Sequence, residues 1–351
     1  MELYIAGGVG EHGRNCFYLQ QGEDAVLVDC GLLAGSADSL PRLSAAQIRR
    51  IRAVFLTHSH ADHTGALPWL CLQGYTGPVI ATTPTLQQLP FVLQNTLPLE
   101  TLAPRGTACN GIKWGLSGHC AGSVWLQLMW NGKIVLFSGD YSEQSRVYPC
   151  DALRGQQADL AVLDCAYGHT SPLWNDSVTA PTAAVHNLLQ KAPIVFLPVP
   201  KYGRGLDLLL QLHHAMPQTP IYGDAHFCRQ TEMTLTGDIW YNSLPRNLCK
   251  WVQPDASCTE GIVFLSDPQL RGAVGQRARE LLQMGAIGVM TGTPDAGSFS
   301  SELLANGQME FWRYPVHLNE TQCAALAAQN HFAQIVRYHS PDFPSPGTIA
   351  L

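Results

Sequence analysis

The chain has 351 residues, of which 46% are hydrophobic and 14% are charged, and its formal net charge is −6. This length suits one large domain or two ordinary ones, and the apolar content predicts a globular protein with a sizeable core. The acidic balance argues against a generally basic nucleic-acid-binding surface, although a pair of metal ions would supply its own positive charge. No apolar run reaches the roughly 18–20 residues that span a membrane, and no signal peptide is expected.

Strand-like and helical patterns alternate along the chain, which predicts an α/β fold. After a first strand at the N-terminus, the expected strands are 15–19, 25–28, 53–56, 124–129, 133–137, 160–163, 194–197, 262–265, 286–290 and 334–337. The expected helices are 63–72, 85–97, 180–190, 205–214, 275–284 and 320–331. A boundary is expected at 170–176. Residues 171–285 then form an inserted module, and residues 286–351 return to the domain begun by residues 1–170.

The densest cluster of candidate metal ligands follows the expected strand 53–56. His58, His60, Asp62 and His63 occur within one short segment, before Gly65 and an expected helix. Imidazole nitrogens and carboxylate oxygens suit a borderline metal such as zinc. Two of the histidines lie two residues apart on an extended segment, so they can point the same way. The other two ligands lie on the turn beyond and can face a second ion, as metal-assisted hydrolysis requires.

Further candidate ligands lie downstream, at strand ends or in glycine-rich turns. His119 lies in the sequence Ser-Gly-His-Cys-Ala-Gly-Ser, whose small residues permit close backbone approach. Asp140 follows the expected strand 133–137 and is placed to bridge two metals. Asp29 follows strand 25–28 in the same way and is expected to orient a ligand by a hydrogen bond. Each pattern alone predicts only a turn, but together with the histidine cluster they form a ligand series.

The series resembles that of the β-CASP nucleases of the metallo-β-lactamase superfamily, which include RNase J and the mRNA 3′-end cleavage endonuclease. The superfamily motifs are similar at 7–15, 56–70, 118–123 and 137–142. The branch motifs are similar at 164–168, with Asp164 in place of the commoner Glu, and at 197–204, 289–293, 314–320 and 336–340. The last two segments keep His317 and His339, although Ser340 stands where the family pattern has Gly.

This resemblance implies an αββα metallo-β-lactamase sandwich, formed by 1–170 and 286–351, with a compact β-CASP-like domain inserted at 171–285. It implies two zinc ions, with manganese as the alternative metal. The implied ligands are His58, His60 and His119 for the first ion, Asp62, His63 and His339 for the second, and Asp140 as the bridge.

The resemblance also implies roles for residues outside the ligand set. His317 is the expected general acid, which protonates the leaving 3′-oxygen. Asp164 orients His317, and Asp62 counts among the catalytic residues as well as the ligands. The expected substrate contacts are Ser123, Gly203 and Arg204.

The sequence therefore predicts a cytoplasmic di-zinc phosphodiesterase, which cleaves single-stranded nucleic acid with a hydroxide held between the metals. RNA is favoured over DNA because of the residue at position 339. A histidine there resembles the pattern of the RNA-acting family members, whereas DNA-acting members tend to have valine at this position. The alternatives are a DNA exonuclease of the compact ligase-associated type, a small-molecule metallohydrolase and a catalytically silent scaffold subunit. A protein partner that supplies basic surface is a further hypothesis.

Two other patterns, one of glycines and one of cysteines, do not predict a further site. The Gly-x-Gly-x-x-Gly stretch at 8–13 precedes an expected strand rather than a helix, which excludes a dinucleotide site. The eleven cysteines are scattered without Cys-x-x-Cys pairs, which argues against a disulfide framework and indicates a reducing compartment. Cys30, Cys120 and Cys165 each follow a candidate site residue, and we expect small buried side chains there rather than redox-sensitive thiols.

Overall fold

The computed structural model describes residues 1–170, 174–236, 238–242 and 251–351. The chain divides into two compact units. The first unit comprises Met1–Gln144, Pro149–Ser171 and Val316–Leu351, and the second unit comprises Ser145–Tyr148 and Pro172–Pro315. Among the described residues, no helix is both long enough and apolar enough to cross a membrane.

The second unit begins at the expected boundary but extends to Pro315 instead of ending at 285. The reason lies in its sheet. Strand β15 (Ile287–Met290) pairs in parallel with β11 (Ile194–Pro198), and β16 (Met309–Phe311) pairs with β15. The expected strand at 286–290 therefore belongs to the inserted unit and is not a return to the first domain.

The first unit contains a seven-stranded sheet with the order β18-β1-β2-β3-β4-β5-β6. The pairings are antiparallel from β18 to β3 and parallel from β3 to β6. Its strands are β1 (Glu2–Gly7), β2 (Cys16–Gln21), β3 (Asp24–Val28), β4 (Ile51–Phe55), β5 (Val79–Ala81), β6 (Thr96–Pro98) and β18 (Thr348–Ala350). Helices α1 (Ala45–Arg50) and α3 (Leu67–Leu72) pack on it, with Ile48 and Leu70 in the same apolar core as Val54.

The second sheet of the first unit has five strands in the order β17-β10-β9-β8-β7. These are β7 (Ile112–Leu116), β8 (Val124–Trp130), β9 (Lys133–Phe137), β10 (Gln157–Asp164) and β17 (His331–Tyr338). Helix α12 (Glu320–Ala328) covers its outer face, where Leu326 packs with Leu136 and Leu163.

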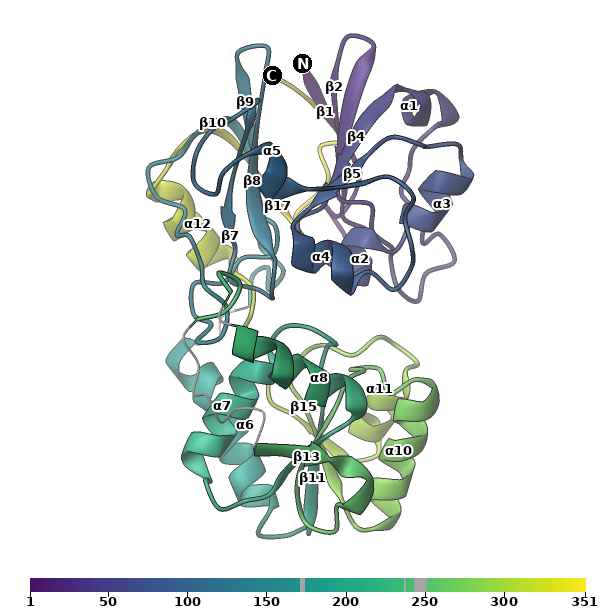
Figure 1. Ribbon diagram of the computed structural model, residues 1–351, viewed down its shortest axis with the longest axis vertical. Coiled ribbons are helices and arrows are strands. Elements are labelled where there is room, and N and C mark those ends of the chain that lie inside the picture. Colours follow the sequence, from purple (N-terminus) through teal and green to yellow (C-terminus); the bar gives the residue numbers. More distant parts are fainter. Residues whose placement is uncertain (171–173, 237, 243–250) are drawn as a thin grey trace. The chain divides into compact units, whose positions relative to one another are not determined.

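The two sheets of the first unit face each other. The ring of Phe17 in β2 contacts Phe137 and Tyr338 of the other sheet, at centroid distances of 5.7 and 5.4 Å. Figure 1 shows α1 and α3 outside one sheet and α12 outside the other. The predicted αββα sandwich is therefore confirmed.

Two expected helices are shorter in the structure. The expected helix 63–72 is split into α2 (Ala61–Thr64) and α3, with Gly65 and Ala66 between them. The expected helix 85–97 is α4 (Thr83–Gln88), followed by an extended residue at Leu89. Leu89 precedes a proline, and a residue in that position is disfavoured in the helical region. A short helix, α5 (Leu99–Leu102), follows β6.

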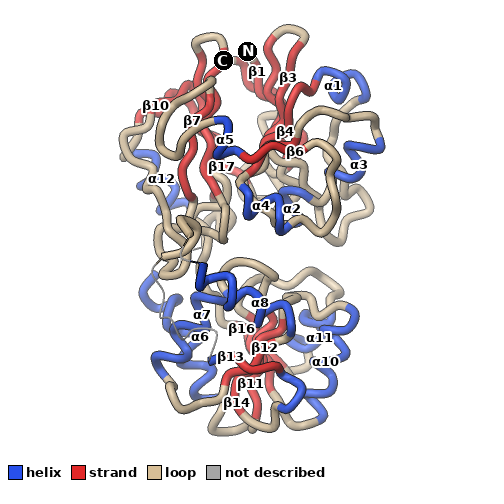
Figure 2. Tube along the Cα trace, in the orientation of Figure 1, coloured by secondary structure: helices blue, strands red, loops and turns tan. Residues whose placement is uncertain are grey.

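The second unit is built on a six-stranded sheet, β13-β12-β14-β11-β15-β16, in which every pairing is parallel. Its remaining strands are β12 (Ile221–Gly223), β13 (Val252–Pro254) and β14 (Gly261–Leu265). The described helices are α6 (Trp174–Leu188), α7 (Gly205–Ala215), α8 (Ala225–Met233), α10 (Gly272–Gln283) and α11 (Phe299–Ala305), with 3-10 turns at Thr234–Thr236 and Asp255–Ser257. Figure 2 shows helices on both sides of this sheet, which explains why its strands are continuous apolar runs.

Candidate metal centre

The seven predicted ligands lie in the first unit, where strand ends bring them together. His58 and His60 follow β4, and the next two ligands lie in α2. His119 follows β7, Asp140 follows β9, and His339 follows β17. Because these strands belong to two facing sheets, their ends converge on one edge of the sandwich. This is where ligands commonly bind in open α/β folds.

The first group of ligands is His58, His60, His119 and Asp140, whose ligand atoms all lie within 4.8 Å of one another. His58 Nε2 and His119 Nε2 lie 3.4 and 3.5 Å from Asp140 Oδ2. His60 Nδ1 lies 3.2 Å from His119 Nε2. His58 Nε2 is buried and has no hydrogen-bond partner among the described residues. A buried polar atom of this kind requires an explanation, and a metal ion provides one.

The second group is Asp62, His63 and His339, also within 4.8 Å of one another. His339 Nε2 lies 2.9 Å from Asp62 Oδ2. Asp140 Oδ1 lies 3.2 Å from both His63 Nε2 and His339 Nδ1. Both ring nitrogens of His339 are buried without a hydrogen-bond partner in the described part of the chain. Asp140 thus turns one oxygen to each group, which is the geometry of a bridging carboxylate.

The surroundings of Asp140 and His119 favour their metal-binding forms, whereas, against the effect of burial, the neighbouring carboxylates raise the pKa of His63 and His339, so a metal ion must displace a proton from each of these two rings. Burial alone would raise the pKa of Asp140, but His63, His339 and His58 hold it well below its usual range. Burial holds the pKa of His119 well below its ordinary value, against the opposing effect of Asp140. An ionised carboxylate and a neutral imidazole are the forms that bind metals.

Asp29, which the sequence predicts to orient a ligand, contacts His63. Its Oδ2 accepts from His63 Nδ1 at 2.8 Å, and its two oxygens also accept from the amide and the hydroxyl of Thr57. The contact fixes the ring so that Nε2 faces Asp140. The backbone of Asp29 has a φ of 60°, a conformation that costs free energy and is concentrated at functional sites.

Replacing Asp29 with asparagine is expected to weaken metal binding by about 10- to 100-fold, the usual cost of losing such a partner. Competition against a chelator of known affinity would measure it. Asp24→Asn is the matched control, because Asp24 begins the same strand and its side chain forms an exposed ion pair with Arg52. Equal affinity in the two variants would show that the orientation of His63 does not depend on this carboxylate.

Two neighbours of the ligands were not predicted as site residues. His12 stacks on His339 with a centroid distance of 4.4 Å, and its Nδ1 donates to the carbonyl of His339 at 2.8 Å. His339 and burial lower the pKa of His12 to about 4, so the ring is neutral near pH 7. Tyr338 donates from its hydroxyl to Asp140 Oδ1 at 3.0 Å. Neither role has a sequence signal beyond proximity to a candidate motif.

Gly31 permits the close approach of the ligand segment. A Cβ at this position would lie 1.6 Å from the carbonyl oxygen of Asp62. The same carbonyl accepts from the amide of Asn15 at 2.8 Å, and the amide of Cys30 donates to the carbonyl of His63 at 2.7 Å. The loops after β1 and β3 therefore hold the backbone of α2 in place.

His317 and Asp164 form a pair beside the ligands. His317 Nδ1 lies 3.1 Å from Asp164 Oδ2 and 3.8 Å from Asp140 Oδ2. The buried carboxylate of Asp164 also accepts from the amides of Tyr141 and Ala166, both at 3.1 Å. The pair with Asp164 leaves Nε2 of His317 for a substrate.

The three residues expected to contact the substrate belong to different units of the structure. Ser123 is buried, accepts from the amides of His119 and Cys120 and donates to the carbonyl of Cys120, so it shapes the turn of His119 instead of facing a substrate. Gly203 and Arg204 lie in the second unit, immediately before α7. Arg204 Nε donates to Thr291 Oγ1 at 3.1 Å. Its contact with a substrate stays a prediction.

The cysteines beside the site are buried, as expected for small core residues. Cys30 and Cys165 are fully buried, and Cys120 is 3% exposed. Burial raises the pKa of the Cys120 thiol, so it is not a reactive thiolate.

Comparison with known proteins gives a consistent assignment. Residues 9–100 match the metallo-beta-lactamase superfamily. The chain is 25% identical over 329 residues to the transcription termination factor FttA of Methanosarcina mazei, covering 82% of this chain and 52% of that protein. It is 26% identical over 251 residues to a ribonuclease of Thermus thermophilus, covering 64% of this chain and 58% of the relative.

A solved protein of unknown function from Enterococcus faecalis aligns with 100% of this chain and 99% of its own, at a TM-score of 0.59 and 12% identity, which shows the fold alone. The chain spans about half the length of the curated relatives it matches. The matched region, the sandwich and the His/Asp cluster all agree with the metallo-β-lactamase motifs found in the sequence. Residues 9–100 therefore match the metallo-β-lactamase superfamily, and the homologues of the chain are β-CASP nucleases.

Proposed function

We propose that the chain is a two-metal phosphodiesterase that cleaves single-stranded RNA. The observation that carries this proposal is Asp140, which lies between two groups of ligand atoms and faces each with a different oxygen. When bound, two such ions lower the pKa of a water molecule and stabilise charge on the phosphoryl oxygens. The ligand set of imidazole and carboxylate favours zinc, with manganese as the alternative.

The chain's own residues handle the proton that the leaving group needs. In the proposed step His317 donates from Nδ1 to Asp164, and Nε2 carries the proton that the leaving group receives. That proton passes to the leaving 3′-oxygen, as in general acid catalysis. Asp164 acts as a positioning residue, because two backbone amides fix its own carboxylate.

RNA is the proposed substrate for two reasons. The histidine at position 339 resembles the residue that RNA-acting family members have there, and one relative is a ribonuclease. The test is cleavage of matched, end-labelled single-stranded RNA and DNA by the metal-loaded chain, with bis(p-nitrophenyl) phosphate as a substrate that lacks bases. RNA cleavage that Asp140→Asn abolishes would support the proposal. Cleavage of DNA alone would favour the exonuclease alternative, and hydrolysis of only the small diester would favour a small-molecule metallohydrolase.

Removing the metal is expected to lower the thermal stability of the first unit. A ligand at 100 times its dissociation constant stabilises the folded state by about 2.7 kcal/mol, which corresponds to roughly 5–10 °C in Tm for a unit of this size. Calorimetry before and after dialysis against EDTA, and again after zinc is restored, would measure it. An unchanged Tm with recoverable activity would contradict a metal buried within the fold.

A further inference from the structure

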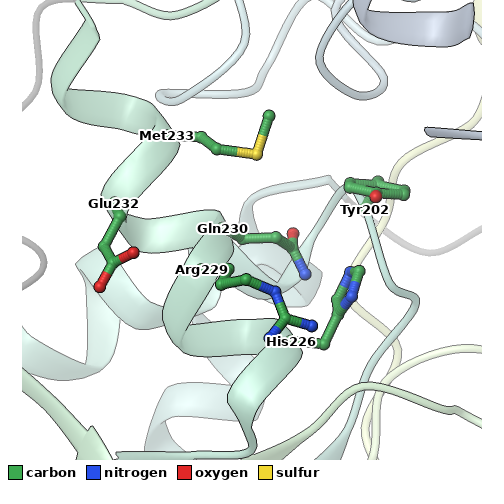
Figure 3. A pocket seen from close by; sticks show the side chains of 6 residues that line it. All are labelled: Tyr202, His226, Arg229, Gln230, Glu232 and Met233. Carbon is green, nitrogen blue, oxygen red and sulfur yellow. The ribbon is translucent and has the colours of Figure 1, made fainter. Parts of the chain in front are cut away.

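The second unit contains a cavity of about 400 Å³. It lies between the loop that leads into α7 and helix α8, and it is lined by Tyr202, His226, Arg229, Gln230, Glu232 and Met233 (Figure 3). This volume is within the range of ligand-binding sites. The cavity is separate from the residues of the metal centre, all of which belong to the first unit.

Gln230 is the residue that points to a ligand. Its side chain is only 5% exposed, yet its amide Nε2 has no hydrogen-bond partner among the described residues. Figure 3 shows the amide turned toward the space beside Tyr202 and His226. A buried hydrogen-bond donor is rarely left without a partner unless there is a functional reason. A ligand atom with a lone pair, such as a keto oxygen, would satisfy it.

Two aromatic rings lie beside this amide. The rings of Tyr202 and His226 meet edge to face, with a centroid distance of 5.2 Å and an interplanar angle of 72°. Nε2 of His226 lies 3.2 Å from the carbonyl oxygen of Lys201, which fixes the ring. Burial lowers the pKa of His226, so the ring is neutral near pH 7. Flat neutral rings stack well on heteroaromatic ligands. This stacking does not depend on which nucleobase is bound.

The cavity lining also includes a positively charged side chain, that of Arg229. Arg229 is exposed, and no carboxylate forms an ion pair with it in the part of the chain that the structure describes. The acidic side chain that lines the cavity, Glu232, points away from the other polar groups in Figure 3. The side of the cavity that holds the amide and the rings therefore presents positive charge, which suits a phosphate.

We propose that this cavity binds one nucleobase of a single-stranded RNA. The base lies against Tyr202 and His226, a keto oxygen accepts from Gln230 Nε2, and the adjoining phosphate lies near Arg229. The proposal rests on the proposed nuclease function and gives the inserted unit a task in holding the substrate. A nucleobase is favoured over a peptide side chain because it offers a flat ring, a keto oxygen and an attached anion together.

Binding is tested with the full chain carrying Asp140→Asn, so that no cleavage interferes. Fluorescence anisotropy would compare short oligouridine with an abasic RNA of equal length. We expect the abasic chain to bind about 10-fold more weakly or worse, since stacking contributes strongly for each base. Gln230→Leu, and separately the exposed substitution Arg229→Ala, should each weaken oligouridine binding by about 5- to 50-fold.

Gln276→Leu is the matched control, because Gln276 is an exposed glutamine on α10 and does not line the cavity. Photo-crosslinking of 4-thiouridine RNA to the chain with its cavity unaltered gives a measurement that needs no cavity variant, and the crosslinks should map to 202–233. Equal binding of abasic RNA and oligouridine, or crosslinks confined to other segments, would overturn the proposal. The binding test needs no turnover, so its failure is distinct from failure to hydrolyse RNA or bis(p-nitrophenyl) phosphate.

Discussion

Replacing Asp140 with asparagine is expected to lower kcat/KM on RNA by more than about 10³-fold and to reduce metal content at both ligand groups. Asp140 Oδ2 lies 3.4 Å from His58 Nε2, and Oδ1 lies 3.2 Å from His63 Nε2. An amide keeps one oxygen and loses the negative charge. Losing a partner outside the coordination sphere already costs about 10- to 100-fold, so losing a ligand shared by two ions costs more.

The measurement is metal content per chain by mass spectrometry, together with single-turnover cleavage. Asp159→Asn is the matched control, because Asp159 lies in β10 of the same sheet and forms a partly exposed ion pair with Lys133 at 3.0 Å. Pairs of this kind contribute about 0–1 kcal/mol, so the control should stay close to the original chain. Two ions per chain and full activity in Asp140→Asn would show that Asp140 is not the bridge.

The candidate site was largely predictable because its signals are local. When a buried strand is followed by Asp or His and a small residue, the pattern predicts that the polar side chain lies at the end of a sheet. In the structure Asp29, Asp140 and Asp164 all follow or end a strand. Their convergence needed the resemblance to a family, because residues such as His58 and His339 lie far apart in the sequence. The sequence pattern alone does not say which strand ends meet.

Other features had no local signal. The strand at 287–290 is apolar in either sheet, so periodicity could not assign it to the second unit. Strands β5 and β6 have three residues each, too few for a period to show. The role of Ser123 depends on a turn that places its hydroxyl beside two amides. The cavity beside Gln230 combines residues from a loop and a helix, and no spacing rule links them.

Replacing His317 with alanine is expected to slow RNA cleavage by about 10²–10⁴-fold while leaving the metal content unchanged. The physical reason is that the leaving 3′-oxygen is a poor leaving group unless it is protonated. His317 Nδ1 is held by Asp164 at 3.1 Å, which leaves Nε2 for this proton. A ligand role would predict loss of metal instead, and that alternative has a basis, because His317 also lies in a group with Asp140, Asp164 and His339.

The leaving group separates the two roles. p-Nitrophenolate departs without a proton, so His317→Ala should lose far less activity on bis(p-nitrophenyl) phosphate than on RNA. Asp164→Asn should show the same dependence on leaving group at a smaller loss, because asparagine keeps a hydrogen-bonding partner for His317 but not the negative charge of the carboxylate. Equal losses on both substrates, with metal missing from His317→Ala, would make His317 a ligand and leave the general acid to be found elsewhere.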